Sequence, residues 1–393
     1  MSTFLLNQYY SESPDWGNDV ADAFCAGDIS ELHCSIPDYS PTPLVELPAL
    51  AANLGVDRLL VKDEAHRFGL KAFKSLGATY AIYRFLREYL KDRNRPCPPP
   101  AKFYLVRNVL SDAELTFCTA TDGNHGRGVA WVARLLRQKA IIYMPAGTVK
   151  ARIENIKQEG AEVVVIDGTY DDCVQRCVSE AETNGWQIIS DTSWAGYETI
   201  PRWIMAGYLT LFREIELALN PVDRIDLVIV QGGVGALAAA AVWYFRKLWT
   251  CLQPQLVSVE PEQAACLLES IASSGGEPIM STGRQDSIMA GLNCGMPSPV
   301  AWPLIKYGFN AFLHVSDKAC IEAMRTYYNT LGDDPRIVSG ESGAAGLAAL
   351  IELTQRGSLA QARLSLGLDS NARILLLNTE GDTDPESFRR VLE

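Results

Sequence analysis

Short apolar runs alternate with longer segments of helical periodicity along most of the chain. Apolar side chains recur at three- and four-residue spacing over residues 72–89, which predicts an amphipathic helix. The apolar runs at 115–119, 140–144 and 162–166 are each typical of a strand, and each precedes a segment with helical spacing. Such alternation is typical of parallel sheets wrapped by helices, so the pattern predicts an α/β fold.

The remaining segments extend this pattern towards both ends of the chain. The first forty residues lack either periodicity, and we expect them to be irregular. A proline run at 96–100 can be neither a helix nor a central strand, and we interpret it as an insertion at a domain crossover. The pattern does not decide whether the strands form one sheet or two. Further strands are predicted at 58–62, 187–190, 227–230, 256–259, 337–338 and 374–377, and further helices at 127–138, 150–158, 171–184, 201–217, 237–248, 317–331 and 343–355.

Composition and charge exclude several classes of protein. The chain of 393 residues carries a formal net charge of −12, which does not favour binding to the negatively charged backbone of a nucleic acid. Its longest apolar stretch, 236–245, is too short to span a bilayer, and no basic region at the N-terminus suggests a signal peptide. The ten cysteines form no CxxC pair, so we expect neither a metal site nor a disulfide framework. Free thiols indicate a reducing compartment, and we expect a cytoplasmic protein.

The strongest candidate for chemistry is a glycine-rich turn at 231–235, between a buried strand and an alanine-rich helix. Backbone amides at the start of a helix can point at an anion, and the helix dipole favours negative charge there. The spacing of the glycines matches neither the dinucleotide fingerprint nor the P-loop. A single phosphate suits this turn, and a tight turn without any ligand is the alternative.

Three further segments carry groups that could take part in chemistry. Asp122, Asn124 and His125 share a second strand-to-helix turn with three glycines, although Asp122 could simply cap the helix. Lys74 lies at the entry to a helix, and lysine chemistry needs the lowered pKa that burial or a cationic neighbour supplies. Asp191 follows a short strand and either faces a site or caps the turn.

Taken in order, these motifs resemble the fold-type II enzymes that use pyridoxal phosphate, the family of threonine dehydratase and cysteine synthase. Within that family the chain looks most like the diaminopropionate ammonia-lyase branch. Any one motif is weak, but the ordered set over roughly residues 40 to 385 is specific for the superfamily. The matching segments are 67–77, 119–131, 144–145, 150–156, 191–194, 200–201, 203–205, 231–235, 289–295 and 378–382.

The resemblance implies how the cofactor would be held. Lys74 would bind pyridoxal phosphate as a Schiff base, and Asn124 would hydrogen-bond the hydroxyl oxygen of its ring. Thr379 would face the pyridine nitrogen, where a hydroxyl rather than a carboxylate leaves that nitrogen unprotonated. Backbone amides of the glycine turn would bind the phosphate, namely those of Gly232, Gly233, Val234 and Gly235.

The resemblance also implies the reaction, which is α,β-elimination of 2,3-diaminopropionate to pyruvate and two molecules of ammonia. The related lyases accept both enantiomers of the substrate, and two bases on opposite faces of the cofactor would explain this. Lys74 would be the base for the L-enantiomer and Asp122 the base for the D-enantiomer. Asp191 would bind the distal ammonium of the substrate or help to move protons. The alternatives are a serine/threonine-type dehydratase or β-replacement synthase on another β-substituted amino acid, and a catalytically silent homologue that binds the cofactor.

As in the relatives, we expect a homodimer whose protomer has two domains, each with a mainly parallel sheet wrapped by helices. Residues 1–90 and 205–393 would form the large cofactor-binding domain, and residues 91–204 the small domain. The expected partner is a small amino-acid substrate, with no nucleic acid, membrane or metal.

The chain departs from the usual pattern of the branch at three positions. Asparagine is usual at Lys71, glycine at Ala78, and an acid at Ala195 in the Trp-x-Gly-Tyr turn. The loss of an acid at Ala195 and the gain of a cation at Lys71 both point away from a dicationic substrate. A different β-substituted amino acid is therefore an open alternative.

Overall fold

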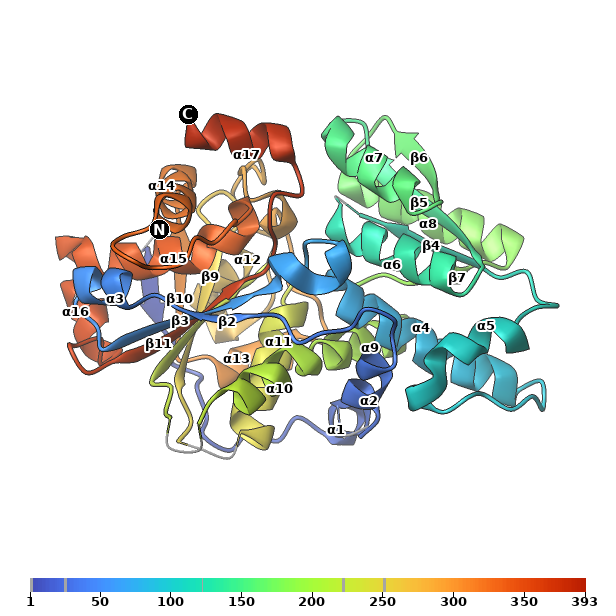
Figure 1. Ribbon diagram of the computed structural model, residues 1–393, viewed down its shortest axis with the longest axis horizontal. Helices are drawn as coiled ribbons and strands as arrows, with labels where there is room; N and C mark the ends of the chain where they lie inside the picture. The colour runs from blue at the N-terminus through green and yellow to red at the C-terminus, as the bar shows by residue number, and fades with distance from the viewer. Residues whose placement is uncertain (1–2, 25–26, 122, 221–222, 250–251) are drawn as a thin grey trace. The chain divides into compact units, whose positions relative to one another are not determined.

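The computed structural model describes residues 3–24, 27–121, 123–220, 223–249 and 252–393. Within these ranges the chain divides into two compact units, each built around its own sheet (Figure 1). The larger unit comprises Met1–Gly17, Pro41–His66 and Leu211–Glu393, and the smaller unit comprises Asn18–Ser40 and Arg67–Thr210. The predicted α/β fold with mainly parallel sheets is confirmed.

The larger unit contains a seven-stranded sheet in the order β1-β10-β9-β8-β11-β3-β2. Its five central strands are parallel, while the two edge strands β1 and β2 run antiparallel to their neighbours. The interiors of β8 and β11 are wholly apolar because helices bury both faces of the sheet. The strands are β1 (Phe4–Leu6), β2 (Leu44–Glu46), β3 (Arg58–Asp63), β8 (Leu227–Gln231), β9 (Gln255–Pro261), β10 (Ala311–Val315) and β11 (Arg373–Asn378).

Helices on both faces of this sheet are rich in alanine and leucine, which allows them to pack closely on the strands. Short 3₁₀ or π turns, η3 (Tyr244–Leu248), η4 (Ser274–Gly276), η5 (Ala290–Leu292) and η6 (Gly357–Leu359), connect or extend them. The helices are α3 (Pro48–Leu54), α10 (Leu209–Ala218), α11 (Ala236–Trp243), α12 (Cys266–Ala272), α13 (Trp302–Gly308), α14 (Asp317–Asn329), α15 (Glu341–Gln355), α16 (Ala360–Ser365) and α17 (Pro385–Leu392).

The smaller unit contains a four-stranded sheet, parallel throughout, in the order β6-β5-β4-β7. The strands are β4 (Thr116–Ala120), β5 (Lys139–Pro145), β6 (Glu162–Ile166) and β7 (Gln187–Ile188). The helical elements of this unit are α1 (Asn18–Phe24), α2 (Ile29–Cys34), η1 (Glu64–Gly69, which begins in the larger unit), α4 (Lys74–Lys91), η2 (Pro100–Leu105), α5 (Val106–Val109), α6 (Asn124–Leu135), α7 (Lys150–Gln158), α8 (Tyr170–Asn184) and α9 (Thr199–Gly207).

Two local predictions are wrong. The segment 337–338 is not a strand: the amide of Ile337 donates to the carbonyl of Tyr327 in an irregular connection, so its apolar side chains fill the core without joining the sheet. The first forty residues are not irregular throughout, because they contribute β1, α1 and α2. These elements are too short to show a clear period in the sequence.

The limits of the two units differ from the domain limits expected from the sequence. All but the last residue of helix α4 lies in residues 1–90, part of the expected large domain, but the helix packs against α6 and α9 of the smaller unit. Gly77 makes this close packing possible, since a Cβ there would lie 2.8 Å from the carbonyl oxygen of Ile204. The sequence-based limits, with 1–90 and 205–393 as the large cofactor-binding domain and 91–204 as the small domain, stay a prediction.

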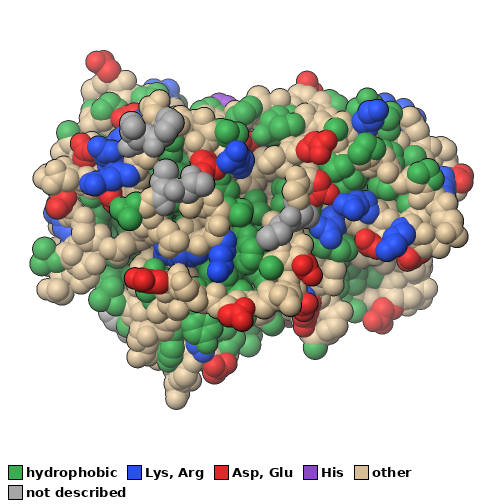
Figure 2. Space-filling view, turned by 90° about the horizontal axis from the view of Figure 1, so that it is seen from below, with side chains coloured by type: hydrophobic (Ala, Val, Ile, Leu, Met, Phe, Trp, Pro, Cys, Tyr) green, Lys and Arg blue, Asp and Glu red, His purple; other side chains and the backbone are tan. Residues whose placement is uncertain are grey.

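The surface mixes charges of both signs. On the face drawn in Figure 2, acidic and basic side chains of the described residues lie interspersed between uncharged and apolar areas. Among the helices in the described ranges, none combines the length and the apolarity that crossing a membrane requires.

Candidate active site

The loop that leads into α4 has an unusual backbone. Phe68 and Lys71 both adopt left-handed conformations, with φ of 48° and 60°, although neither is glycine. Two contacts with α6 hold the loop in this shape: the ring of Phe68 stacks on Trp131 with centroids 4.9 Å apart, and Arg127 donates a hydrogen bond to the carbonyl of Leu70 at 3.1 Å. Strained backbone that the surroundings hold in place is typical of functional sites.

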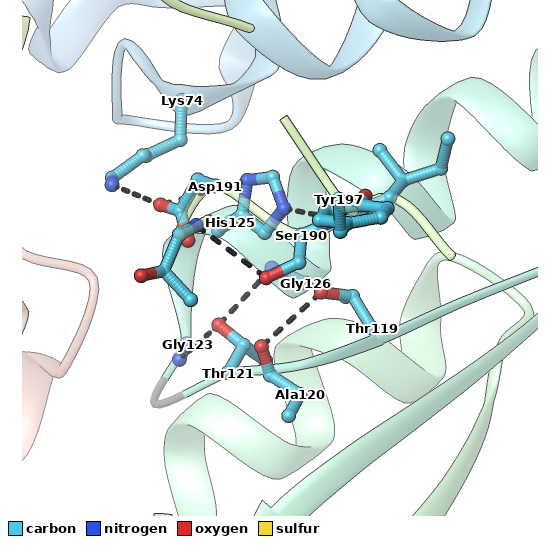
Figure 3. A network of polar contacts seen from close by, with 12 residues as sticks. Lys74, Thr119, Ala120, Thr121, Gly123, His125, Gly126, Ser190, Asp191 and Tyr197 are labelled. Atoms are coloured by element: carbon cyan, nitrogen blue, oxygen red, sulfur yellow. Dashed lines mark hydrogen bonds and ion pairs between the residues drawn. The ribbon is translucent and has the colours of Figure 1, made fainter. Parts of the chain in front are cut away.

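Lys74, the first residue of α4, forms an ion pair with Asp191 (Figure 3). Its Nζ donates to Asp191 Oδ2 at 2.6 Å, and the two side chains are 19% and 11% exposed. His125 Nδ1 lies 3.9 Å from the same carboxylate oxygen. Burial on its own raises the pKa of the Asp191 carboxyl, but the charges of His125 and Lys74 and the Lys74 hydrogen bond outweigh it and hold this pKa well below its usual range. Asp191 is therefore a carboxylate that stays ionised.

The orientation of His125 is fixed by the backbone. Its Nε2 lies 2.7 Å from the carbonyl oxygen of Ile189, and because a carbonyl only accepts hydrogen bonds, Nε2 carries the proton. The other ring nitrogen is thereby turned towards Asp191. The sequence motif contained His125, but its spacing gave no indication that the imidazole would meet a carboxylate 66 positions away.

The turn after β7 supports Asp191 through Tyr197. The hydroxyl of Tyr197 accepts a hydrogen bond from the amide of Ser190 at 2.8 Å and donates one to the carbonyl of Ile188 at 3.0 Å. Its ring stacks on Trp194, with centroids 4.3 Å apart. Sequence reasoning missed Tyr197, although the Trp-x-Gly-Tyr pattern that places it was visible.

The predicted turn between β4 and α6 contributes Asn124, the half-buried first residue of α6. Thr121 closes this turn, because its hydroxyl accepts hydrogen bonds from the amides of Gly123 and Gly126 (Figure 3). Asp122, the predicted second base, lies outside the described residues. Lys74, Asn124, His125 and Asp191 thus belong to the smaller unit, on the segments that follow its strands β4 and β7 or enter α4.

The glycine turn of the larger unit follows β8 and opens α11. Gly233 and Gly235 have φ of 62° and 99°, which side chains rarely adopt. A Cβ on Gly232 would lie 2.7 Å from Glu260 Cγ, and one on Gly235 would clash with Ile305 Cδ1, so neither position has room for a side chain. The turn therefore exposes its backbone amides at the start of α11, an arrangement that suits a phosphate group.

The four amides of this turn are not equivalent. The Gly232 amide donates to the carbonyl of Val259 at 2.9 Å, and the Gly235 amide donates to the Gly232 carbonyl at 3.2 Å. The amides of Gly233 and Val234 have no acceptor among the residues that the structure describes. The amides most suited to an anion are therefore those of Gly233 and Val234.

Thr379 directly follows β11 and is buried. Its neighbour Asn378 donates from Nδ2 to Asp63 Oδ1 at 2.7 Å, which ties the ends of β11 and β3 together. Gln231, at the end of β8, donates to the carbonyl of Leu377 at 2.7 Å. Thr379 and the glycine turn thus follow the carboxyl ends of the neighbouring parallel strands β11 and β8, where α/β folds bind ligands.

The three residues that depart from the branch pattern lie in different surroundings within the smaller unit. Lys71 occupies the strained loop before α4, a left-handed position that asparagine adopts more readily than lysine. Ala78 is fully buried in α4, and Ala195 is exposed in the turn that Trp194 and Tyr197 close.

Known proteins with similar sequences identify the family. The family model described as "Pyridoxal-phosphate dependent enzyme" matches residues 36–369. The chain is 38% identical over 400 residues to the diaminopropionate ammonia-lyase of Salmonella typhimurium, an alignment that covers 100% of this chain and 98% of that protein.

Solved structures agree with this result. A crystal structure of diaminopropionate ammonia-lyase from Escherichia coli, in complex with D-serine, is similar with a TM-score of 0.89 and 36% identity over 99% of this chain and 96% of that one. The processed form of threonine deaminase isoform 2 from Solanum lycopersicum shares the fold, with a TM-score of 0.72 and 20% identity over 99% and 96% of the two chains. The resemblance inferred from the motifs is confirmed. The chain belongs to the fold-type II pyridoxal-phosphate dependent enzymes and, within them, to the family of the diaminopropionate ammonia-lyases.

Proposed function

We propose that the chain catalyses α,β-elimination of 2,3-diaminopropionate to pyruvate and two molecules of ammonia. The observation that carries this proposal is the 2.6 Å ion pair of Lys74 and Asp191, in a chain similar over its whole length to diaminopropionate ammonia-lyases. The pair offers an amine that can exchange a proton beside a carboxylate that stays charged, as elimination next to an ammonium group requires.

Pyridoxal phosphate, the cofactor of the family, supplies an electron sink that stabilises negative charge at the Cα of a bound amino acid. Lys74 would hold it covalently, and the amides of Gly233 and Val234 would bind its phosphate, while the Gly235 amide closes the turn onto the Gly232 carbonyl. Gly232 would serve the turn through its lack of a side chain, because its amide is already used by Val259. Asn124 would bind the ring hydroxyl oxygen and Thr379 would face the pyridine nitrogen.

Residues of the smaller unit would remove the Cα proton of the substrate and bind its ammonium group. Lys74 Nζ would take the Cα proton of the L-enantiomer, and Asp122 would take that of the D-enantiomer. Asp191 would attract the distal ammonium of the substrate, since its carboxylate stays ionised across the physiological pH range. His125, held by the Ile189 carbonyl through Nε2, would stabilise that carboxylate through its positive charge when Nδ1 also carries a proton.

We further propose that the enzyme acts in the cytoplasm as a homodimer on a small amino acid. The eight cysteines among the described residues are free thiols, which supports a reducing compartment.

The test is release of pyruvate by purified enzyme loaded with cofactor. D- and L-2,3-diaminopropionate are compared with L-serine, and with L-threonine, which would give 2-oxobutyrate. The Lys74→Ala protein provides the blank. Turnover of a diaminopropionate enantiomer well above that of both hydroxy amino acids supports the proposal. A cofactor-loaded enzyme that ignores both enantiomers refutes it and implicates Lys71 and Ala195 in a different specificity.

A further inference from the structure

A buried carboxyl group lies directly beneath the glycine turn. Glu260, near the end of β9, is 0% exposed. Its Oε1 accepts a hydrogen bond from the amide of Leu267 and its Oε2 accepts one from the amide of Leu268, both at 2.8 Å. Both oxygens are thus engaged by the first turn of α12, and the carboxyl group joins β9 to that helix.

The same side chain shapes the glycine turn. The missing Cβ of Gly232 would lie 2.7 Å from Glu260 Cγ and 3.3 Å from its Cδ, so the methylene and carboxyl carbons fill the space under the turn. Helix α12, which Glu260 holds, also reaches the turn, because Cys266 Sγ donates to the carbonyl of Gly233 at 3.5 Å. Glu260 therefore supports the turn from below and fixes the helix that contacts it.

Such a group is costly to bury. Within the described ranges no lysine, arginine or histidine forms an ion pair with Glu260, and transfer of an uncompensated charge into the interior is unfavourable. Burial raises the pKa of Glu260 to about 8, against the two amide hydrogen bonds that lower it. An apolar residue there would leave the amides of Leu267 and Leu268 without these acceptors, so the carboxyl group serves α12 as well as the space under the turn.

We infer that Glu260 is a positioning residue for the cofactor's phosphate: by joining β9 to α12 and filling the space below Gly232, it holds the amides of Gly233 and Val234 in their binding orientation. This inference rests on one part of the proposed function, namely that the glycine turn binds the phosphate of the cofactor. It does not depend on which amino acid the enzyme consumes.

The experiment compares two ligands on the apoprotein of Glu260→Gln. Pyridoxal phosphate carries the phosphate, whereas pyridoxal has the same ring and aldehyde without it, and binding of both is followed by absorbance of the lysine-bound form. Glutamine keeps the volume but turns an NH₂ donor towards one of the two amides. We expect binding of pyridoxal phosphate to become at least about tenfold weaker, because one buried amide of α12 loses its acceptor, with pyridoxal affinity unchanged within about twofold.

Glu269→Gln is the matched control. Glu269 is also a buried carboxylate on α12, and it accepts hydrogen bonds from the Ser281 hydroxyl at 3.0 Å and the Thr282 amide at 2.7 Å, away from the glycine turn. This variant should bind both ligands like the wild type. Equal losses of the two ligands in Glu260→Gln, or unchanged affinity for pyridoxal phosphate, would overturn the inference.

A second pair of variants covers the case in which Glu260→Gln does not fold. Cys266→Ala removes the donor to Gly233, and Cys266→Ser restores one. We expect Cys266→Ala to weaken pyridoxal phosphate selectively by about two- to threefold, with Cys266→Ser closer to the wild type. Equal behaviour of the two variants would contradict the role of α12. If the enzyme binds pyridoxal phosphate as expected but does not consume diaminopropionate, the proposed function fails while this inference stands.

Discussion

Replacement of Asp191 by asparagine removes the negative charge of the Lys74 ion pair while it preserves the size of the side chain. Two unit charges 2.6 Å apart attract each other by about 6 kcal/mol at an effective dielectric constant of about 20, and desolvation offsets most of this attraction. Removal of one partner from a buried pair costs about 3–5 kcal/mol. Because Lys74 is 19% exposed and asparagine can still accept a hydrogen bond, we expect a loss near the lower limit, about 3 kcal/mol, in the apoprotein.

The pH dependence of this loss follows from the direction of the pKa shift. The folded protein holds the pKa of Asp191 below that of the unfolded chain, which is about 3.9, so the folded state binds this proton less tightly. The pair therefore stabilises the fold above about pH 4, and this contribution declines as pH falls through the depressed pKa. The difference between wild type and Asp191→Asn should be constant from pH 5 to 8 and shrink in stronger acid.

Denaturant unfolding of the two apoproteins at pH 7 and at low pH measures this difference. Asp334→Asn is a suitable control, because Asp334 is buried and accepts hydrogen bonds from the amides of Ala49 and Leu50 but contacts no cation among the described residues. Equal destabilisation of both variants at both pH values would show that the Lys74 charge is irrelevant to Asp191 and would refute the reasoning.

Three further predictions concern the cofactor and the two bases. Lys74→Ala should remove the absorbance of the lysine-bound cofactor and all pyruvate release, and retention of that absorbance would show that another lysine binds it. Gly235→Ala places a Cβ against Ile305 Cδ1 at a φ of 99°, so we expect weaker binding of pyridoxal phosphate and a loss of about 1–3 kcal/mol in stability, measured by titration and unfolding. Asp122→Asn should lower turnover of the D-enantiomer about 100-fold or more with a smaller effect on the L-enantiomer, and steady-state rates that fall equally would remove the two-base assignment.

The sequence predicted local features well where one segment carries its own pattern. The buried strand β8, the glycine turn and the helix α11 follow each other directly, so apolar composition and glycine spacing sufficed to predict this strand, turn and helix. The same holds for the strand-to-helix turn that contains Asn124 and His125.

Features that depend on distant segments could not be predicted in this way. The sorting of strands into two sheets requires β11 to lie between β8 and β3, an order that no local period encodes. Glu260 resembles any strand residue until α12 folds back onto it, and the left-handed backbone of Lys71 contradicts the preference of lysine. Both are imposed by tertiary packing, which overrides local propensity.

The most direct test of the central claim is the rate of pyruvate formation from D- and L-2,3-diaminopropionate by cofactor-loaded enzyme, with L-serine as the reference. We expect at least one enantiomer of diaminopropionate to be consumed much faster than serine, and Asp191→Asn to abolish most of that advantage. If serine is the better substrate, or if neither enantiomer yields pyruvate from an enzyme that visibly carries its cofactor, the proposed function is contradicted.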